Sequence, residues 1–196
     1  MRYSHRFIST CAFAIVVALS PATGTAKEKT SGISTSGVHS SKLAIDNFGQ
    51  VSGTYYRGAQ PTGRDYADLA ALGIKTVINL TSDDADVTEQ SMVEKAGMTY
   101  LQIPMTTHEP PTDAQIAEFL AAVNDSAQRP VYVHCVGGKH RTGVMTAVYR
   151  MTQDAWKPDQ AFKEMKQYKF GADFLHSEFK KFVYGYRTDL NAKAQS

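Results

Sequence analysis

Cysteine is nearly absent from this 196-residue chain, which contains only Cys11 and Cys135. Cys11 lies in residues 1–26, which begin with two arginines, continue as a short apolar run and end in small residues. This order predicts a secretory signal peptide, because the apolar run is too short to span a bilayer; a transmembrane anchor is the alternative. Removal of the leader would leave one cysteine, which excludes an intramolecular disulfide. We therefore expect a secreted or periplasmic protein without a stable membrane anchor, and a retained thiol in an oxidising compartment is a candidate for chemistry.

The chain also lacks a large excess of positive or of negative charge. The chain has 21 lysines and arginines and 19 acidic residues, which gives a formal net charge of +2. Two of the basic residues and none of the acidic ones fall in residues 1–26, so the remaining chain has a net charge of zero. A neutral chain gives no argument for binding to nucleic acid or to a membrane surface, and we expect neither partner.

Apolar residues are sparse just after the leader and frequent later. Residues 27–46 are rich in Ser, Thr and Gly, which predicts a flexible linker. Residues 47–190 have the length of one domain, which we interpret as the functional domain, and residues 191–196 form a short tail.

Within the domain, apolar residues alternate between the strand period and the helix period. We expect strands over 55–56, 75–80, 99–103 and 130–133 and helices over 62–72, 87–96, 112–123, 142–151, 158–167 and 174–187. Strands that alternate with helices predict an α/β fold with a mainly parallel central sheet flanked by helices on both faces. Ligands of such sheets bind at the carboxyl ends of the strands.

The segment His134–Gly143, with the sequence HCVGGKHRTG, joins the last expected strand to a helix. Its backbone N–H groups can surround an oxyanion, with the positive end of the helix dipole behind them. The same field favours a thiolate, because a cysteine at a helix N-terminus beside cations ionises more readily than a free one. Cys135 is therefore the predicted nucleophile.

Other residues of this segment have roles that follow from their chemistry. Arg141 presents a planar fork that can hold two oxygens of a phosphate. Gly137 and Gly138 allow the loop backbone to approach its neighbours without a Cβ clash. Thr142 either donates a hydrogen bond to the cysteine sulfur or simply begins the helix. His134 is expected to order the loop by hydrogen bonds and not to transfer protons.

This loop resembles the active-site loop of the protein tyrosine phosphatase superfamily, in which cysteine and arginine are separated by five residues and followed by threonine. The sequence GKHRTG resembles the atypical dual-specificity branch, which includes fungal and plant inositol-pyrophosphate phosphatases. Segments 56–61, 77–80, 103–105 and 147–150 also resemble small bacterial tyrosine-phosphatase-like proteins, so the resemblance covers residues 48–190.

The resemblance implies a dual-specificity-phosphatase-like fold, a phosphocysteine intermediate, and a reaction without a metal ion or other cofactor. The substrate-binding residues that it implies are Val136, Gly137, Gly138, Lys139, His140 and Thr142. Lys139 and His140 would add positive charge at the rim of the loop, unless they are only solvated surface charges.

The superfamily also uses an aspartate, some 30 residues before the cysteine, to protonate the leaving oxygen. No aspartate lies between Asp86 and Asp113, and Asp113 is the position that best matches the atypical branch. The dipole of the helix that begins there stabilises a charged carboxylate, which is unfavourable for an acid. Asp113 is therefore either the general acid or only a helix-start charge, and Glu109 and His108 are the other candidates.

A weak general acid limits the choice of substrate. It matters least when the leaving group is a weak base such as phosphate or a phenol, so aryl phosphates and phosphoanhydrides are favoured over phosphoserine. The leading hypothesis is a secreted phosphatase for phosphotyrosine or dual-specificity protein substrates. The alternative is an inositol polyphosphate or pyrophosphate phosphatase of the phytase-like kind. A rhodanese-like sulfurtransferase and an inactive phosphate-binding module are further hypotheses, and the intact Cys135 and Arg141 argue against the second of these.

Overall fold

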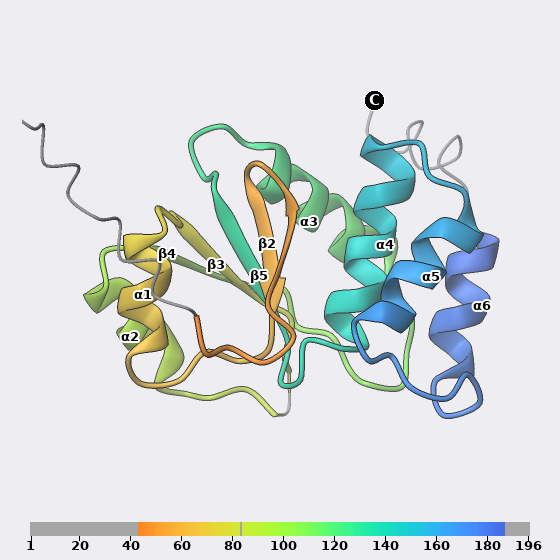
Figure 1. Cartoon of the computed structure of the whole chain (residues 1–196), viewed down its shortest axis with the longest axis horizontal. Helices are drawn as coiled ribbons and strands as arrows, with labels where there is room; N and C mark the ends of the chain where they lie inside the picture. Colours follow the sequence, from red (N-terminus) through yellow and green to blue (C-terminus); the bar gives the residue numbers. More distant parts are fainter. Residues whose placement is uncertain (1–42, 83, 187–196) are drawn as a thin grey trace, which may run out of the picture. The chain divides into compact units, whose positions relative to one another are not determined.

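A five-stranded sheet lies at the centre of the computed structural model (Figure 1). The strands are β1 (Gly49–Ser52), β2 (Tyr55–Gly58), β3 (Thr76–Asn79), β4 (Thr99–Gln102) and β5 (Val131–His134). Their order across the sheet is β1-β2-β5-β3-β4. Only β1 and β2 pair in antiparallel fashion, and all other neighbours run parallel. The prediction of a mainly parallel α/β sheet is therefore confirmed.

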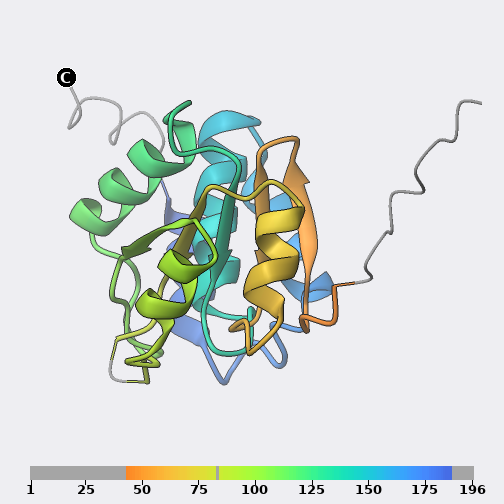
Figure 2. The ribbon, with the colours of Figure 1, turned by 90° about the vertical axis from the view of Figure 1, so that its left-hand side faces the viewer.

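Helices cover both faces of this sheet. The described residues form α1 (Asp65–Ala71), α2 (Glu89–Lys95), α3 (Asp113–Asn124), α4 (Arg141–Gln153), α5 (Pro158–Gln167) and α6 (Ser177–Gly185). Helices α1 and α2 lie on one face, and α3 to α6 lie on the other (Figures 1 and 2). The expected helices on both faces are thus present.

The structure describes residues 43–82 and 84–186, which all belong to the unit Ser40–Ser196. The predicted signal peptide, most of the predicted linker and the predicted tail lie outside these residues. Among the helices that are described, none has the length and apolar character needed to cross a membrane.

Two cores separate the sheet from its helices. The larger core, under α3 to α6, contains the fully buried Tyr55, Phe119 and Val133. The smaller core, under α1 and α2, contains Tyr132. Successive residues of a strand point to opposite faces, so this alternation sends Tyr132 to one side and Val133 to the other. Cys135 continues it and packs in the larger core.

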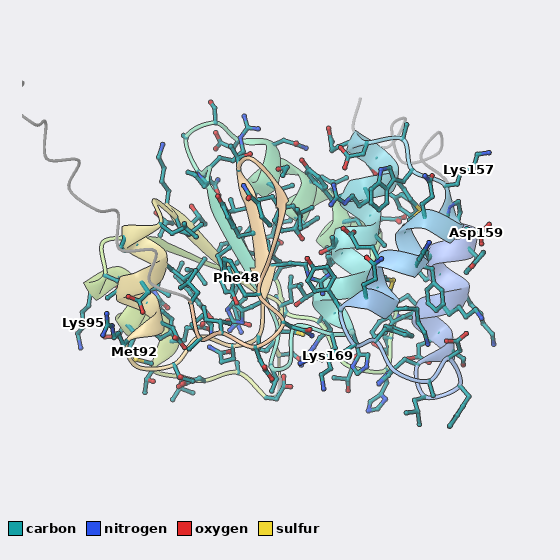
Figure 3. All side chains as sticks on the ribbon, viewed as in Figure 1. Phe48, Met92, Lys95, Lys157, Asp159 and Lys169 are labelled. Atoms are coloured by element: carbon teal, nitrogen blue, oxygen red, sulfur yellow. The ribbon has the colours of Figure 1, made fainter. Side chains whose placement is uncertain are left out.

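The packed chain begins before β1. Ile45 is 7% exposed in the smaller core, and the Phe48 ring lies 6.0 Å from that of Tyr56 and 6.1 Å from that of Tyr132 (Figure 3). The pairing of β1 with β2 was not predicted. In β1 only Val51 is buried, so the sequence of this strand carries no alternating pattern.

Two helix predictions are confirmed at their ends. Helix α5 spans the expected residues, Pro158–Gln167, with proline at its first position, where the missing N–H costs nothing. Helix α3 begins with a capping box, in which the Thr112 side chain accepts a hydrogen bond from the Gln115 N–H and the Gln115 side chain accepts one from the Thr112 N–H. The local chemistry at these helix starts is visible in the sequence alone.

The predicted start of the last helix is wrong. Helix α6 begins at Ser177 and not at residue 174, and Phe174 and Leu175 are 80% and 62% exposed. The carboxylate of Asp173 binds one lysine of α5 and one of α6, each at 2.7 Å. These ion pairs fix the residues before α6 as a bend between two helices, so the apolar pair does not reach the core.

Candidate active site

The connection from β5 to α4 lies at the carboxyl end of the sheet (Figure 1). It begins with Cys135 and ends at Arg141. Cys135 directly follows β5 and is 3% exposed, and Arg141 is the first residue of α4 and is 2% exposed. The Arg141 guanidinium interacts electrostatically with Cys135, and its Nε is buried without a hydrogen-bond partner among the described residues. The structure thus brings the predicted nucleophile and the predicted phosphate ligand together.

The carbonyl groups of the loop are held from outside by an earlier part of the chain. The three contacts are Asn47 Nδ2 to the Gly137 oxygen (3.1 Å), Arg57 Nη2 to the Gly138 oxygen (2.5 Å) and the Gln60 N–H to the Val136 oxygen (3.1 Å). Peptide groups whose oxygens are fixed outward turn their N–H groups the other way, which is the arrangement of an anion cradle. These three donors were not recognised from the sequence, because they come from a segment more than seventy residues earlier.

Only one of the two loop glycines is required by close packing. Gly138 has a φ of +62°, and a Cβ there would lie 2.4 Å from the carbonyl carbon and oxygen of Gly58 and 2.7 Å from the Ala59 nitrogen. At Gly137 a Cβ would meet only the Lys139 side chain, at 3.5 Å. The sequence prediction assigned close approach to both glycines, and the structure restricts it to Gly138.

The Arg141 fork is occupied by a carboxylate. Nη1 and Nη2 donate to Asp84 Oδ1 and Oδ2 at 2.7 and 2.6 Å, and Nη1 also lies 3.2 Å from the Met105 carbonyl oxygen. The hydrogen bonds from Arg141 hold the pKa of the Asp84 carboxyl below its ordinary value. A carboxylate offers the same paired oxygens as a phosphate. Asp84 thus lies where the oxygens of a substrate phosphate are expected, and it was not among the site residues predicted from the sequence.

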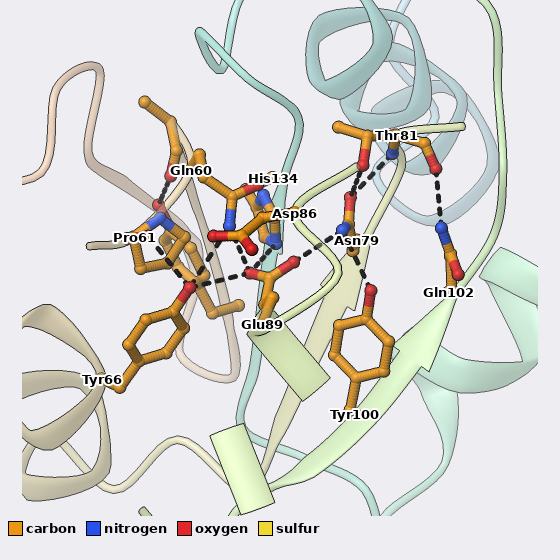
Figure 4. Close-up of polar contacts among 12 residues, drawn as sticks. Gln60, Pro61, Tyr66, Asn79, Thr81, Asp86, Glu89, Tyr100, Gln102 and His134 are labelled. Atoms are coloured by element: carbon orange, nitrogen blue, oxygen red, sulfur yellow. Dashed lines mark hydrogen bonds and ion pairs between the residues drawn. The ribbon is translucent and has the colours of Figure 1, made fainter. Parts of the chain in front are cut away.

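Among the described residues, the His134 side chain makes no hydrogen bond to the loop that it was expected to order. Its side chain is fully buried, and Nε2 lies 2.9 Å from Glu89 Oε1, an ion-pair distance without ideal hydrogen-bond geometry (Figure 4). Glu89 also accepts hydrogen bonds from Gln60 Nε2 and Asn79 Nδ2, both at 2.6 Å, and from the Tyr66 hydroxyl at 3.3 Å. The histidine before the nucleophile is therefore tied to the α2 side of the sheet.

The side chains at the rim of the loop differ in their burial and in their contacts. His140 Nε2 lies 3.0 Å from the Phe170 carbonyl oxygen, and its ring centroid is 3.7 Å from that of His176. Burial, followed by the charge of His176, lowers the pKa of His140. This direction disfavours the charged ring that was expected at the rim of the loop. Lys139 is half-buried, and Val136 is 49% exposed.

Thr142 is fully buried, and its hydroxyl has no partner among the described residues. Both expected roles therefore remain predictions: a hydrogen bond to the sulfur during the reaction, or a simple helix start. A buried hydroxyl without a partner has a cost, which a ligand or the reacting sulfur could remove.

The candidates for the general acid lie in different places. Asp113 is exposed at the first position of α3. A small pocket is lined by Pro104, Met105, Thr106, Glu109, Pro110, Thr112 and Gln115. Met105 connects this pocket to Arg141 through its carbonyl oxygen. Glu109 lines the pocket and Asp113 does not, while His108 is exposed.

Taken together, these residues form a buried thiol, a guanidinium fork and an N–H cradle at one helix start. This arrangement can bind a phosphate and attack it.

In residues 43–82 and 84–186 no three His, Cys, Asp or Glu side chains are grouped as a metal site would require. The prediction of a reaction without a cofactor remains a prediction.

Comparisons with known proteins find phosphatases among the proteins that this chain resembles. The sequence model of a family described as "DSP-PTPase phosphatase fused to NAD+ Kinase" matches residues 38–182. The dual specificity protein phosphatase TpbA of Pseudomonas aeruginosa is 31% identical over 126 residues, which are 64% of this chain and 56% of TpbA. The inositol diphosphatase SIW14 of Saccharomyces cerevisiae is 25% identical over 130 residues, 64% of this chain and 46% of SIW14. The chain thus spans about half the length of these two relatives.

Solved structures share the fold. The crystal structure of Pseudomonas aeruginosa TpbA superimposes with a TM-score of 0.66 at 28% identity, over 76% of this chain and 91% of that one. The core catalytic domain of SIW14 from Saccharomyces cerevisiae gives a TM-score of 0.65 at 22% identity, over 76% of this chain and 91% of its own. The sheet order and helix layers described above are therefore those of known phosphatase folds.

Proposed function

Since the chain belongs to the DSP-PTPase phosphatase family, whose model matches residues 38–182, we propose that it is a cysteine-dependent phosphatase that hydrolyses phosphate monoesters. One observation carries this proposal. Cys135 and Arg141 meet at the start of α4, in a loop whose carbonyl groups are held outward. A buried thiol and a fixed guanidinium around an anion cradle suit phosphoryl transfer.

The reaction has two steps. In the first, the Cys135 thiolate attacks phosphorus, a sulfur–phosphorus bond forms, and the bond to the leaving oxygen breaks as that oxygen takes a proton. Arg141 holds two non-bridging oxygens and must exchange Asp84 for them. In the second step, water attacks phosphorus and gives a proton to the group that protonated the leaving oxygen, the sulfur–phosphorus bond breaks, and phosphate leaves with the thiolate restored. Neither step needs a metal ion.

Phosphotyrosine-type proteins are the substrate class that we place first. A cysteine-to-serine variant of the related TpbA has been crystallised in complex with pTyr, and a phenol leaves readily when the general acid is weak. Inositol polyphosphates or pyrophosphates are the second candidate, since SIW14 is an inositol diphosphatase and a phosphate leaving group is also a weak base. We further propose export from the cytoplasm, on the basis of the leader in residues 1–26.

The proposal is tested by assaying the full chain and Cys135→Ser on a phosphotyrosine peptide, inositol hexakisphosphate and thiosulfate, with and without EDTA. Wild type should hydrolyse at least one phosphate ester in EDTA, and Cys135→Ser should lose turnover but keep ester binding, because a serine hydroxyl is not ionised at neutral pH. Cys11→Ser, which removes the other thiol, is the matched control. Turnover of Cys135→Ser above about a tenth of wild type would rule out the covalent mechanism, and turnover of thiosulfate alone would favour a sulfurtransferase.

A further inference from the structure

Arg57 is a fully buried arginine directly behind the phosphate loop. It lies in β2, and its Nη2 donates to the carbonyl oxygen of Gly138. The guanidinium carbon sits 4.0 Å from the ring centroid of Tyr168, in a cation–π contact. Its Nε and Nη1 have no hydrogen-bond partner among the described residues. A positive charge is thus buried with one carbonyl and one aromatic face around it.

No carboxylate balances this charge by direct contact in residues 43–82 and 84–186. The groups that interact electrostatically with Arg57 are Tyr55, Tyr168, Glu164 and Cys135. Glu164 is engaged by Arg150, which donates to both of its oxygens. Burial raises the pKa of Tyr55, so this phenol is neutral at pH 7.

Burial lowers the pKa of Arg57 from its usual value, but a guanidinium stays protonated at neutral pH. A buried charge without a counter-charge is strongly unfavourable. Among the groups that interact with Arg57, Cys135 is the one that can become negative at neutral pH and is not held in a carboxylate ion pair; it interacts with Arg57 behind the loop and with Arg141 at the start of α4. A thiolate, and later a bound phosphate, would supply the missing negative charge.

We propose that Arg57 is a positioning residue of the phosphatase reaction, which fixes the Gly138 carbonyl outward and stabilises the Cys135 thiolate with a buried, otherwise uncompensated positive charge. This inference rests on the proposed role of Cys135. It gives the site a second arginine on the side away from substrate, while Arg141 acts on the phosphate itself.

Arg150 provides a matched control within the same chain. It too is largely buried and stacks on an aromatic ring, with its guanidinium carbon 4.4 Å from the Trp156 centroid. Its charge is compensated by Asp154 and Glu164, at 2.7 and 2.8 Å. Removing either arginine disturbs packing, but only the loss of Arg57 removes a charge that the thiolate uses.

The test compares Arg57→Gln, Arg57→Met and Arg150→Met in the full chain. Glutamine removes the charge but keeps an N–H₂ donor for Gly138, whereas methionine removes both. The rate of inactivation by iodoacetamide, a neutral reagent, is followed against pH, together with kcat/KM for para-nitrophenyl phosphate and the thermal melt. Both Arg57 variants should move the midpoint of inactivation to higher pH by about one unit, the size expected for loss of a nearby opposite charge. Arg150→Met should lower the melting temperature without moving that midpoint.

The outcomes separate three explanations. A wild-type midpoint in Arg57→Gln would overturn the electrostatic role, and so would failure of both Arg57 variants to fold, since the arginine would then serve folding alone. Equal shifts in all three variants would also overturn it. If iodoacetamide modifies Cys135 of the wild type without loss of activity, the proposed function itself fails. If modification abolishes activity but Arg57→Gln keeps the midpoint, only the inference about Arg57 fails.

Discussion

Asp84 binds both terminal nitrogens of Arg141 with its two carboxylate oxygens, at 2.7 and 2.6 Å. The Asp84 side chain is 38% exposed, whereas that of Arg141 is 3% exposed. The carboxylate can therefore swing into solvent while the guanidinium stays in place. On the proposed function, phosphate and Asp84 would compete for the same fork, so Asp84, which lies between β3 and α2, would be an internal competitor of the ligand.

Replacing Asp84 should strengthen phosphate binding. Because the Asp84 side of this ion pair is exposed and screened by solvent, the pair contributes about 0.2–1 kcal/mol, so Asp84→Asn should lower the inhibition constant of inorganic phosphate by up to about fivefold. The Asp84 pKa is lowered in the folded protein, so the ion pair is present above the ordinary value of about 3.9 and is lost only as the pH falls through the folded value. The difference should hence be constant from about pH 5 to 8.

The control for this experiment is Asp86→Asn, whose exposed carboxylate binds only Thr88 in the described structure. It should leave phosphate inhibition unchanged. Weaker phosphate binding in Asp84→Asn would contradict the prediction and would mean that Asp84 holds Arg141 in its productive position.

The two loop glycines should respond differently to alanine. Gly138→Ala places a Cβ 2.4 Å from the Gly58 backbone at a φ of +62°, which adds a clash to a backbone cost of about 1–2 kcal/mol. We expect kcat/KM to fall by about tenfold or more. Gly137→Ala meets only a flexible lysine side chain and should cause a clearly smaller loss. Steady-state kinetics on para-nitrophenyl phosphate would decide, and equal losses would show that the close approach to Gly58 is unimportant.

The general acid should be identified by two substitutions and two substrates. If Asp113 is the acid, Asp113→Asn should slow an alkyl phosphate by about 10²–10⁴ and leave para-nitrophenyl phosphate nearly unchanged. If Asp113 is only a helix-start charge, both substrates should be affected alike, with a stability loss of about 0.3–1 kcal/mol. Glu109→Gln is the competing variant, because Glu109 lines the pocket beside Met105.

Glu118→Gln, in the middle of α3 and exposed, is the control for both variants. A selective loss in Glu109→Gln would transfer the acid role to Glu109. No selective loss in either variant would leave His108 or water as the proton donor.

The loop 134–143 could be predicted from the sequence because each of its features is encoded by residues that are neighbours in the chain. A β-rich run, a cysteine, glycines and a helix start follow one another over a few residues, and each carries its own signal. The capping box at Thr112 and the proline start of α5 are local in the same way.

The partners of the loop could not be predicted because they come from distant parts of the chain. Asn47, Arg57 and Asp84 meet the loop only when β2 and β3 take their places on either side of β5. The Tyr-Arg-Gly motif around Arg57 matched related proteins, but nothing in its sequence shows which carbonyl the arginine would bind. The bend before α6 was missed for the same reason, since Asp173 needs lysines from two helices.

The buried Glu89 has a consequence for how this domain folds. Its hydrogen-bond donors come from the Gln60 turn, Tyr66 of α1 and Asn79 of β3, and His134 of β5 lies at ion-pair distance (Figure 4). A carboxylate gives up its water without a large cost only when all its replacement donors are present together. A partly assembled sheet would hold a desolvated charge, so intermediates with only some of these elements are unfavourable. We therefore expect the strand before Cys135 to form cooperatively with the other elements, and the backbone amides of β3 and β5 to exchange with solvent only when the whole domain opens.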